Sequence, residues 1–291
     1  MIRVNTTPEA LLQAVNAIDD KWIGKADKRT AAFVVAKKYA EPNPIWSTVK
    51  PAFMALQNNK CVFCERQFES ELYGKIEFDL EHFRPKSSVL AWPVVGRHDY
   101  VYEFGTGGDN PAGYYWLPYA LSNYAASCKV CNSNLKSNFF PVARKRVTEP
   151  GDLVGEKALL NYPLSDGDTD PEDLVTFVAT TAVPKVKSGY NYRRGRVIID
   201  FFDLNKREQL HRERANMIIL LGNSLANAAN GTGDDTDDVL IASLVEPVYP
   251  HTNCLRAFRK AWDKDRAFAI KALKACKAYY AAGKGAKPPA P

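Results

Sequence analysis

Apolar residues in the first 57 positions recur every three or four residues, the spacing of a helix with one buried face. Thr7-Pro8-Glu9 predicts the start of a first helix, because it supplies an N-cap, a proline at the first helical position and an acidic first turn. A second helix is expected over about residues 28–39. The apolar stripe of a third helix follows and consists of Ile45, Trp46, Val49, Phe53 and Leu56.

Residues 74–80 end in an alternation of apolar and acidic side chains, which predicts a half-buried strand. If the apolar side chains face inward, Glu81 and His82 lie where the strand gives way to a turn at Pro85. Residues 92–113 are rich in glycine and proline and are expected to form a loop.

The second half of the chain alternates between helical and loop patterns. Residues 175–183 predict a strand, and a long helix is expected to start after Asn205. The last helix is expected to run from Leu255 to Tyr280 with one apolar face. Together these patterns predict a mostly helical protein of the α+β class.

Two Cys-x-x-Cys pairs stand at Cys61/Cys64 and Cys128/Cys131. Four thiolates are the complete tetrahedral ligand set of a structural zinc ion. Because 63 residues separate Cys64 from Cys128, the pairs are too far apart for a short zinc ribbon. A sizeable segment is therefore expected to fold between the two halves of the metal site. The other two cysteines have no such partner nearby and are expected to be buried thiols.

The composition is that of an ordinary soluble globular protein, with 46% hydrophobic and 25% charged residues in 291. No apolar run approaches the roughly 18 residues of a membrane span. The first residues do not resemble a secretory signal. Six cysteines, four of them in paired spacing, suit metal ligation in a reducing compartment, so a cytoplasmic location is expected.

The net charge of +6 is unevenly distributed. Residues 256–291 carry ten Lys or Arg and two Asp, a balance of +8, which leaves −2 for the rest of the chain. A basic C-terminal helix suggests a polyanionic partner. A solubilising charged helix face is the alternative, and the charge distribution taken alone favours it.

Between the cysteine pairs lies Glu81-His82-Phe83-Arg84-Pro85-Lys86, followed by Asn123 and, directly after Cys131, by Asn132. This order resembles the HNH (ββα-metal) nucleases, in the version whose core is held by a four-cysteine zinc. In that family an acid–His pair ends the first strand, an Asn lies in the loop, and a His or Asn on the helix completes the metal site. The residues of these motifs are more similar still to those of the HNH effectors of Septu and retron antiphage systems, the PtuB-like proteins. This resemblance covers roughly residues 50–215.

The resemblance implies a small ββα-metal core and a metal-dependent endonuclease that hydrolyses phosphodiester bonds, with DNA as the favoured substrate. Glu81 and Asn132 are expected to bind a catalytic Mg²⁺ or Mn²⁺, with His82 as the general base and Asn123 as a brace for its loop. The zinc ion only holds the fold. The family more often has Asp where this chain has Glu81, which shifts the ion slightly. The candidate phosphate contacts are Arg84, Lys86 and Lys136.

Three regions are expected: a helical region over residues 1–58, the HNH core over 59–142, and a mainly helical region over 143–291. PtuB-like proteins work beside an ATPase, so the resemblance also implies an antiphage defence effector with an ATPase partner. The alternative is a non-catalytic, zinc-stabilised subunit that binds nucleic acid or another protein. The acid–His pair together with Asn132 favours the nuclease, because a module that only binds does not need these three residues.

Overall fold

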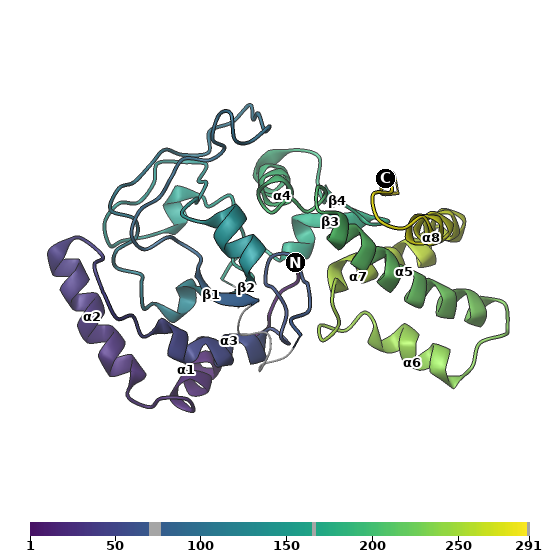
Figure 1. The fold of residues 1–291 in the computed structure, drawn as a ribbon, viewed down its shortest axis with the longest axis horizontal. Helices are drawn as coiled ribbons and strands as arrows, with labels where there is room; N and C mark the ends of the chain where they lie inside the picture. The colour runs from purple at the N-terminus through teal and green to yellow at the C-terminus, as the bar shows by residue number, and fades with distance from the viewer. Residues whose placement is uncertain (70–76, 165–166, 290–291) are drawn as a thin grey trace. The chain divides into compact units, whose positions relative to one another are not determined.

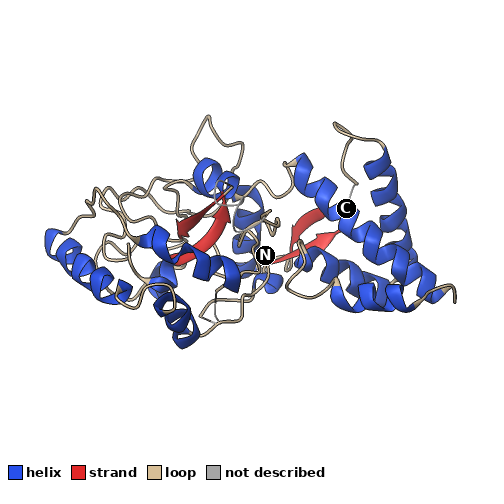
Figure 2. Ribbon diagram, turned by 60° about the horizontal axis from the view of Figure 1, so that its bottom comes forward, coloured by secondary structure: helices blue, strands red, loops and turns tan. Residues whose placement is uncertain are grey.

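The computed structural model describes residues 1–69, 77–164 and 167–289. The described chain is mostly helical and contains two separate two-stranded antiparallel sheets, which confirms the predicted α+β class (Figures 1 and 2). It divides into two compact units. The N-terminal unit comprises residues 3–62 and 68–169, and the C-terminal unit comprises residues 170–291 together with 1–2 and 63–67. None of the helices in the described part is both long enough and apolar enough for a membrane span.

The N-terminal unit opens with a series of helices. They are α1 (Pro8–Asn16), α2 (Trp22–Ala36), the 3₁₀ helix η1 (Trp46–Val49) and α3 (Lys50–Leu56). The predicted start of α1 is confirmed, since the Thr7 hydroxyl accepts a hydrogen bond from Ala10 N at 3.2 Å. The single helix expected from Ile45 onward is wrong. Pro51 stands in the first turn of α3, and inside one continuous helix its ring would clash with the carbonyl four residues earlier.

Strands β1 (Phe78–His82) and β2 (Tyr124–Cys128) form an antiparallel pair in which Phe78 faces Cys128 and His82 faces Tyr124. Helix α3 packs against both strands (Figure 1). The 3₁₀ helix η3 (Leu121–Asn123) leads into β2, and a short π-helix, η4 (Val130–Lys136), follows it. The predicted strand is confirmed from Phe78 onward, and its residues 74–76 lie outside the described part.

The connection between β1 and β2 is anchored by backbone hydrogen bonds that run in both directions between Val89 and Asn110, at 2.7 and 2.8 Å. Tyr114 N donates to Pro85 O at 2.8 Å, which ties the connection to the turn directly after β1. Gly113 has a φ of +60° at this crossing, and a Cβ there would lie 2.7 Å from Ser88 N. The close approach of the two backbone segments therefore requires glycine.

The described residues of the C-terminal unit form the short 3₁₀ helix η6 (Pro171–Asp173), one hairpin and five α-helices. The hairpin strands and the α-helices are β3 (Val175–Val178), β4 (Thr181–Pro184), α4 (Gly189–Phe201), α5 (Glu208–Ala229), α6 (Asp235–Ser243), α7 (Thr252–Lys264) and α8 (Arg266–Ala281). The hairpin packs against α4 and α7, and α5 packs against α6, α7 and α8. Its core includes Leu221, Phe258, Leu273 and Cys276.

Two predicted elements of the C-terminal unit differ from the structure. The strand predicted over residues 175–183 is a tight hairpin, which turns at Ala179 with a φ of +47°. The last predicted helix is two helices, because Asp265 leaves helical geometry (φ −146°, ψ 84°) and its carboxylate accepts a hydrogen bond from Phe268 N at 3.0 Å. An N-cap thus interrupts an apolar pattern that by itself reads as continuous.

Replacing Gly113 tests the tight crossing behind β1. In Gly113→Ala, both the left-handed backbone and the contact with Ser88 oppose the added methyl group. Gly96 is the matched control, because its φ is +80° and nothing lies within 4 Å of its Cβ position. Gly96→Ala should lower the free energy of unfolding by about 1–2 kcal/mol, and Gly113→Ala by at least about 2 kcal/mol more, measured by denaturant titration. Equal losses in the two variants would contradict the crossing.

Candidate active site

The four cysteines of the two Cys-x-x-Cys pairs meet in one buried cluster. Their sulfur atoms all lie within 4.8 Å of one another, and none of the six cysteines, all of which the structure describes, forms a disulfide. Tetrahedral Zn–S bonds of about 2.3 Å place the sulfurs about 3.8 Å apart, so the cluster fits a zinc ion. Cys128 ends β2 and Cys131 lies in η4. Val62, between the first two cysteines, donates to Ala126 O of β2 at 3.1 Å, which brings the first pair to the second.

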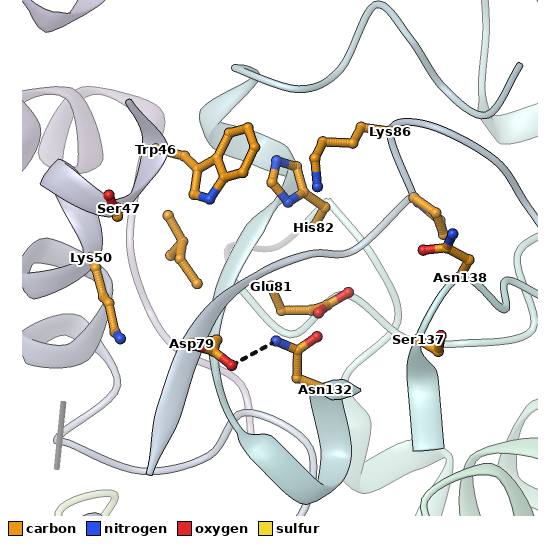
Figure 3. A pocket seen from close by; sticks show the side chains of 12 residues that line it. Trp46, Ser47, Lys50, Asp79, Glu81, His82, Lys86, Asn132, Ser137 and Asn138 are labelled. Atoms are coloured by element: carbon orange, nitrogen blue, oxygen red, sulfur yellow. Dashed lines mark hydrogen bonds between the residues drawn. The ribbon is translucent and has the colours of Figure 1, made fainter. Parts of the chain in front are cut away.

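A pocket of about 310 Å³ lies within the N-terminal unit, beside β1 (Figure 3). It brings together four of the predicted site residues, namely Glu81, His82, Lys86 and Asn132. Asp79, Trp46 and Lys50 also line it. The other three predicted site residues, Arg84, Asn123 and Lys136, are not part of the lining.

His82 is held in a defined orientation at the end of β1. Its Nε2 lies 3.0 Å from Pro118 O. Since a carbonyl can only accept, Nε2 carries the proton and Nδ1 keeps the lone pair. The rings of Trp46 and Tyr124 stand nearly perpendicular to the imidazole, with centroids at 4.8 and 5.1 Å. Burial, together with the nearby Lys86 ammonium, holds the pKa of His82 well below its ordinary value, so the ring is neutral at pH 7.

Lys136 lies beneath the acid–His pair and is completely buried. Its ammonium forms an ion pair with the Glu81 carboxylate and donates a hydrogen bond to His82 O at 2.9 Å. Burial raises the pKa of Glu81, and the Lys136 ammonium opposes that rise by stabilising the carboxylate. One lysine therefore fixes the side chain of Glu81 and the backbone of His82 at the same time.

Asp79 is a third oxygen-bearing side chain beside Glu81 and Asn132, and the sequence analysis did not predict it. Asn132 Nδ2 donates to Asp79 Oδ2 at 3.3 Å, and Figure 3 shows the Asn132 amide oxygen turned toward the Glu81 carboxylate. Two carboxylates and one amide oxygen thus converge on the pocket. The signal was present in the sequence, because Asp79 stands two residues before Glu81 and alternate residues of a strand share one face.

Asn123 fastens the turn that follows β1. Its Oδ1 accepts from Arg84 N at 2.7 Å, and its Nδ2 donates to Arg84 O at 3.0 Å and to Leu117 O at 3.2 Å. Both donor and acceptor of the side-chain amide are thus engaged by backbone. The arrangement holds residue 84, and with it the end of β1, against the segment that precedes β2.

The basic residues suggested as phosphate contacts lie in different surroundings. Arg84 Nε donates to the buried Glu156 carboxylate at 2.8 Å, and its guanidinium lies 5.1 Å from the centre of the Phe140 ring. Lys86 lines the pocket, with its ammonium 4.5 Å from the centre of the Trp46 ring. A phosphate contact by Arg84 or Lys136 stays a prediction, since both carry ion pairs within the fold.

Comparison with known proteins identifies a distant homologue. No family model matches the chain. The chain is 32% identical over 221 residues to the Septu protein PtuB of Bacillus mycoides strain KBAB4. The match covers 74% of this chain and 66% of the relative, so the chain spans slightly less than two thirds of that protein's length.

The buried thiolate cluster predicts that zinc is required for folding. Cys128→Ser should give insoluble or unfolded protein, because three thiolates leave the buried metal site incomplete. Cys276→Ala is the control, since Cys276 is equally buried but lies in the hydrophobic core of the C-terminal unit. It should stay soluble and keep about one zinc per chain, measured by elemental analysis. A folded Cys128→Ser protein with wild-type thermal stability would contradict the zinc site.

Proposed function

We propose that the chain is a metal-dependent HNH endonuclease that hydrolyses phosphodiester bonds in nucleic acid, with DNA as the favoured substrate. The observation that carries the proposal is a neutral, oriented imidazole in the same pocket as three convergent oxygen groups. Burial of ionisable groups costs free energy, and clusters of such groups are typical of catalytic sites. Binding of nucleic acid alone does not require these groups to be buried together.

Asp79, Glu81 and Asn132 are the residues that would hold a divalent ion. Carboxylate and amide oxygens are the donors preferred by hard cations such as Mg²⁺ and Mn²⁺. The Asn132 oxygen faces the Glu81 carboxylate, and both are acceptors, so a cation suits the space between them (Figure 3). Such an ion, when bound, stabilises negative charge on the phosphate and on the leaving 3′ oxygen.

His82 is proposed as the general base. Nδ1 can take a proton from the attacking water because Nε2 is already protonated and bonded to Pro118 O. The same carbonyl then stabilises the imidazolium that forms. The Lys86 ammonium lies 4.5 Å from the centre of the Trp46 ring and 5.5 Å from that of Tyr39. We assign it to the phosphate, which is a stronger partner for an ammonium than a ring.

The homology to a Septu protein supports a role in antiphage defence, in which this chain would be the effector nuclease beside an ATPase partner. Retrieval of an ATPase with the tagged chain from its host would support that role. The alternative is a non-catalytic subunit that binds nucleic acid or a partner through the same zinc-stabilised fold.

Cleavage by the purified chain is the direct test. Plasmid, single-stranded DNA and RNA should each be incubated with Mg²⁺ or with EDTA. We expect DNA to be cut in the presence of Mg²⁺ and to stay intact in the presence of EDTA. His82→Ala should keep its thermal stability within a few degrees and lose at least about 100-fold in rate, because the general base is gone. His98→Ala, in the long loop outside the pocket, should cut normally. Equal rates for wild type and His82→Ala would contradict the assignment.

The third oxygen ligand can be tested by ion dependence. Asp79→Asn preserves shape and the position of a hydrogen-bonding group but removes one charge. It should raise the Mg²⁺ concentration for half-maximal cutting about 10-fold, since carboxylates are favoured ligands of this ion. Glu81 is less suitable for this test, because its removal would leave Lys136 buried without its counter-charge. An unchanged Mg²⁺ requirement in Asp79→Asn would remove Asp79 from the ion site.

A further inference from the structure

We infer that Trp46, which lies outside the β1–β2 core, is a positioning residue that holds the imidazole of His82 and the ammonium of Lys86 in place. The inference rests on the proposed nuclease function. Trp46 belongs to η1 and lines the pocket together with both side chains (Figure 3). One indole therefore contacts the proposed base and the proposed phosphate contact.

The contact with His82 restricts the rotation of the imidazole. The two ring centroids are 4.8 Å apart and the rings are at 90°, and Tyr124 contacts the imidazole in a similar perpendicular arrangement at 5.1 Å. The hydrogen bond to Pro118 O fixes only one ring nitrogen, so the ring could still tilt about that bond. Contacts with two aromatic rings oppose such tilting and thereby hold Nδ1 in one direction.

The Lys86 ammonium lies over the face of the same indole ring. The Lys86 ammonium lies 4.5 Å from the Trp46 ring centre and 5.5 Å from that of Tyr39. A cation is attracted to the negative face of an aromatic ring, and tryptophan is the most favourable partner. Burial lowers the pKa of Lys86, and the Glu81 carboxylate opposes that change. The two rings thus hold a flexible side chain beside the acid–His pair.

The segment that carries Trp46 is itself fixed to the fold. Trp22 Nε1 donates to Ile45 O at 3.0 Å, and Ile45 N donates to the Tyr119 hydroxyl at 3.1 Å. The Tyr119 hydroxyl in turn donates to Glu41, which also pairs with Arg29. Both backbone groups of Ile45 are therefore hydrogen-bonded, which fixes the start of η1, the segment that carries the indole.

Removal of the ring should therefore lower the rate of cutting more than it lowers stability. Trp46→Ala should reduce kcat about 10- to 100-fold at saturating substrate, since a small misplacement of a catalytic group has effects of that size. Trp46→Phe keeps an aromatic ring and should retain kcat within about 5-fold. Val49→Ala is the matched control, because Val49 is fully buried in the same 3₁₀ helix and its truncation weakens the segment without removing the ring.

Nuclear magnetic resonance gives a readout that does not depend on cleavage. The chain has four histidines, so the ring protons of His82 can be assigned by comparison with His82→Ala. Trp46→Ala should move these signals by about 0.5 ppm or more through loss of the ring current, whereas Val49→Ala should leave them nearly unchanged.

The outcomes separate the inference from the proposed function. Loss of kcat in Trp46→Ala, with rescue by Trp46→Phe and near-normal cutting by Val49→Ala, would support the positioning role. Full kcat in Trp46→Ala, or an equal loss in Val49→Ala at the same melting temperature, would overturn it and leave the nuclease function standing. If the wild-type chain cut no nucleic acid, the proposed function would fail. The His82 signals would then show only whether the indole packs on the imidazole, and the positioning role would fall with the nuclease function.

Discussion

The fold of the N-terminal unit depends on the antiparallel pairing of β1 with β2. The strand ladder is five residues long, and it ends at the cysteine cluster on one side and at the pocket on the other. At one end Phe78 faces Cys128, the first residue of the second cysteine pair. At the other end His82 faces Tyr124 beside the pocket. A shift of one residue in this register would turn every side chain of the strand to the opposite face, so the thiolate cluster and the pocket depend on the same backbone hydrogen bonds.

Buried polar side chains fix the pocket end of this ladder. Asn123 holds the backbone of residue 84, and Arg84 is held in turn by the buried Glu156 carboxylate. Glu156 also accepts hydrogen bonds from the Tyr114 hydroxyl at 2.7 Å and from Val147 N at 3.3 Å. A carboxylate taken out of water is stable only when its oxygens are satisfied in this way. The turn after β1 therefore owes its shape to polar contacts between segments far apart in the sequence.

The sequence predicted those features that local spacing determines, and missed those that depend on tertiary contacts. The α+β class, the start of α1 and the meeting of the four cysteines follow from periodicity, capping and pair spacing. The split at Pro51 and the cap at Asp265 were also readable, but the apolar stripes were continuous and concealed them. The ion pair of Lys136 with Glu81 joins residues 55 positions apart, and no pattern in the chain indicates it. Likewise, Trp46 had the spacing of a core residue, and only the fold brings it to His82.

The charges around the pocket have a thermodynamic consequence for how an ion and a substrate would load. Asp79 and Glu81 supply two negative charges, and three ammonium groups, those of Lys50, Lys86 and Lys136, leave a small positive excess before anything binds. A divalent cation arriving alone would add to this positive excess, whereas the negative charge of a phosphodiester offsets it. Each therefore raises the affinity of the site for the other, and by linkage the two effects are equal in size. Under the proposed function, such a site would hold its ion only weakly until nucleic acid is present, so the arrival of substrate would itself promote binding of the ion.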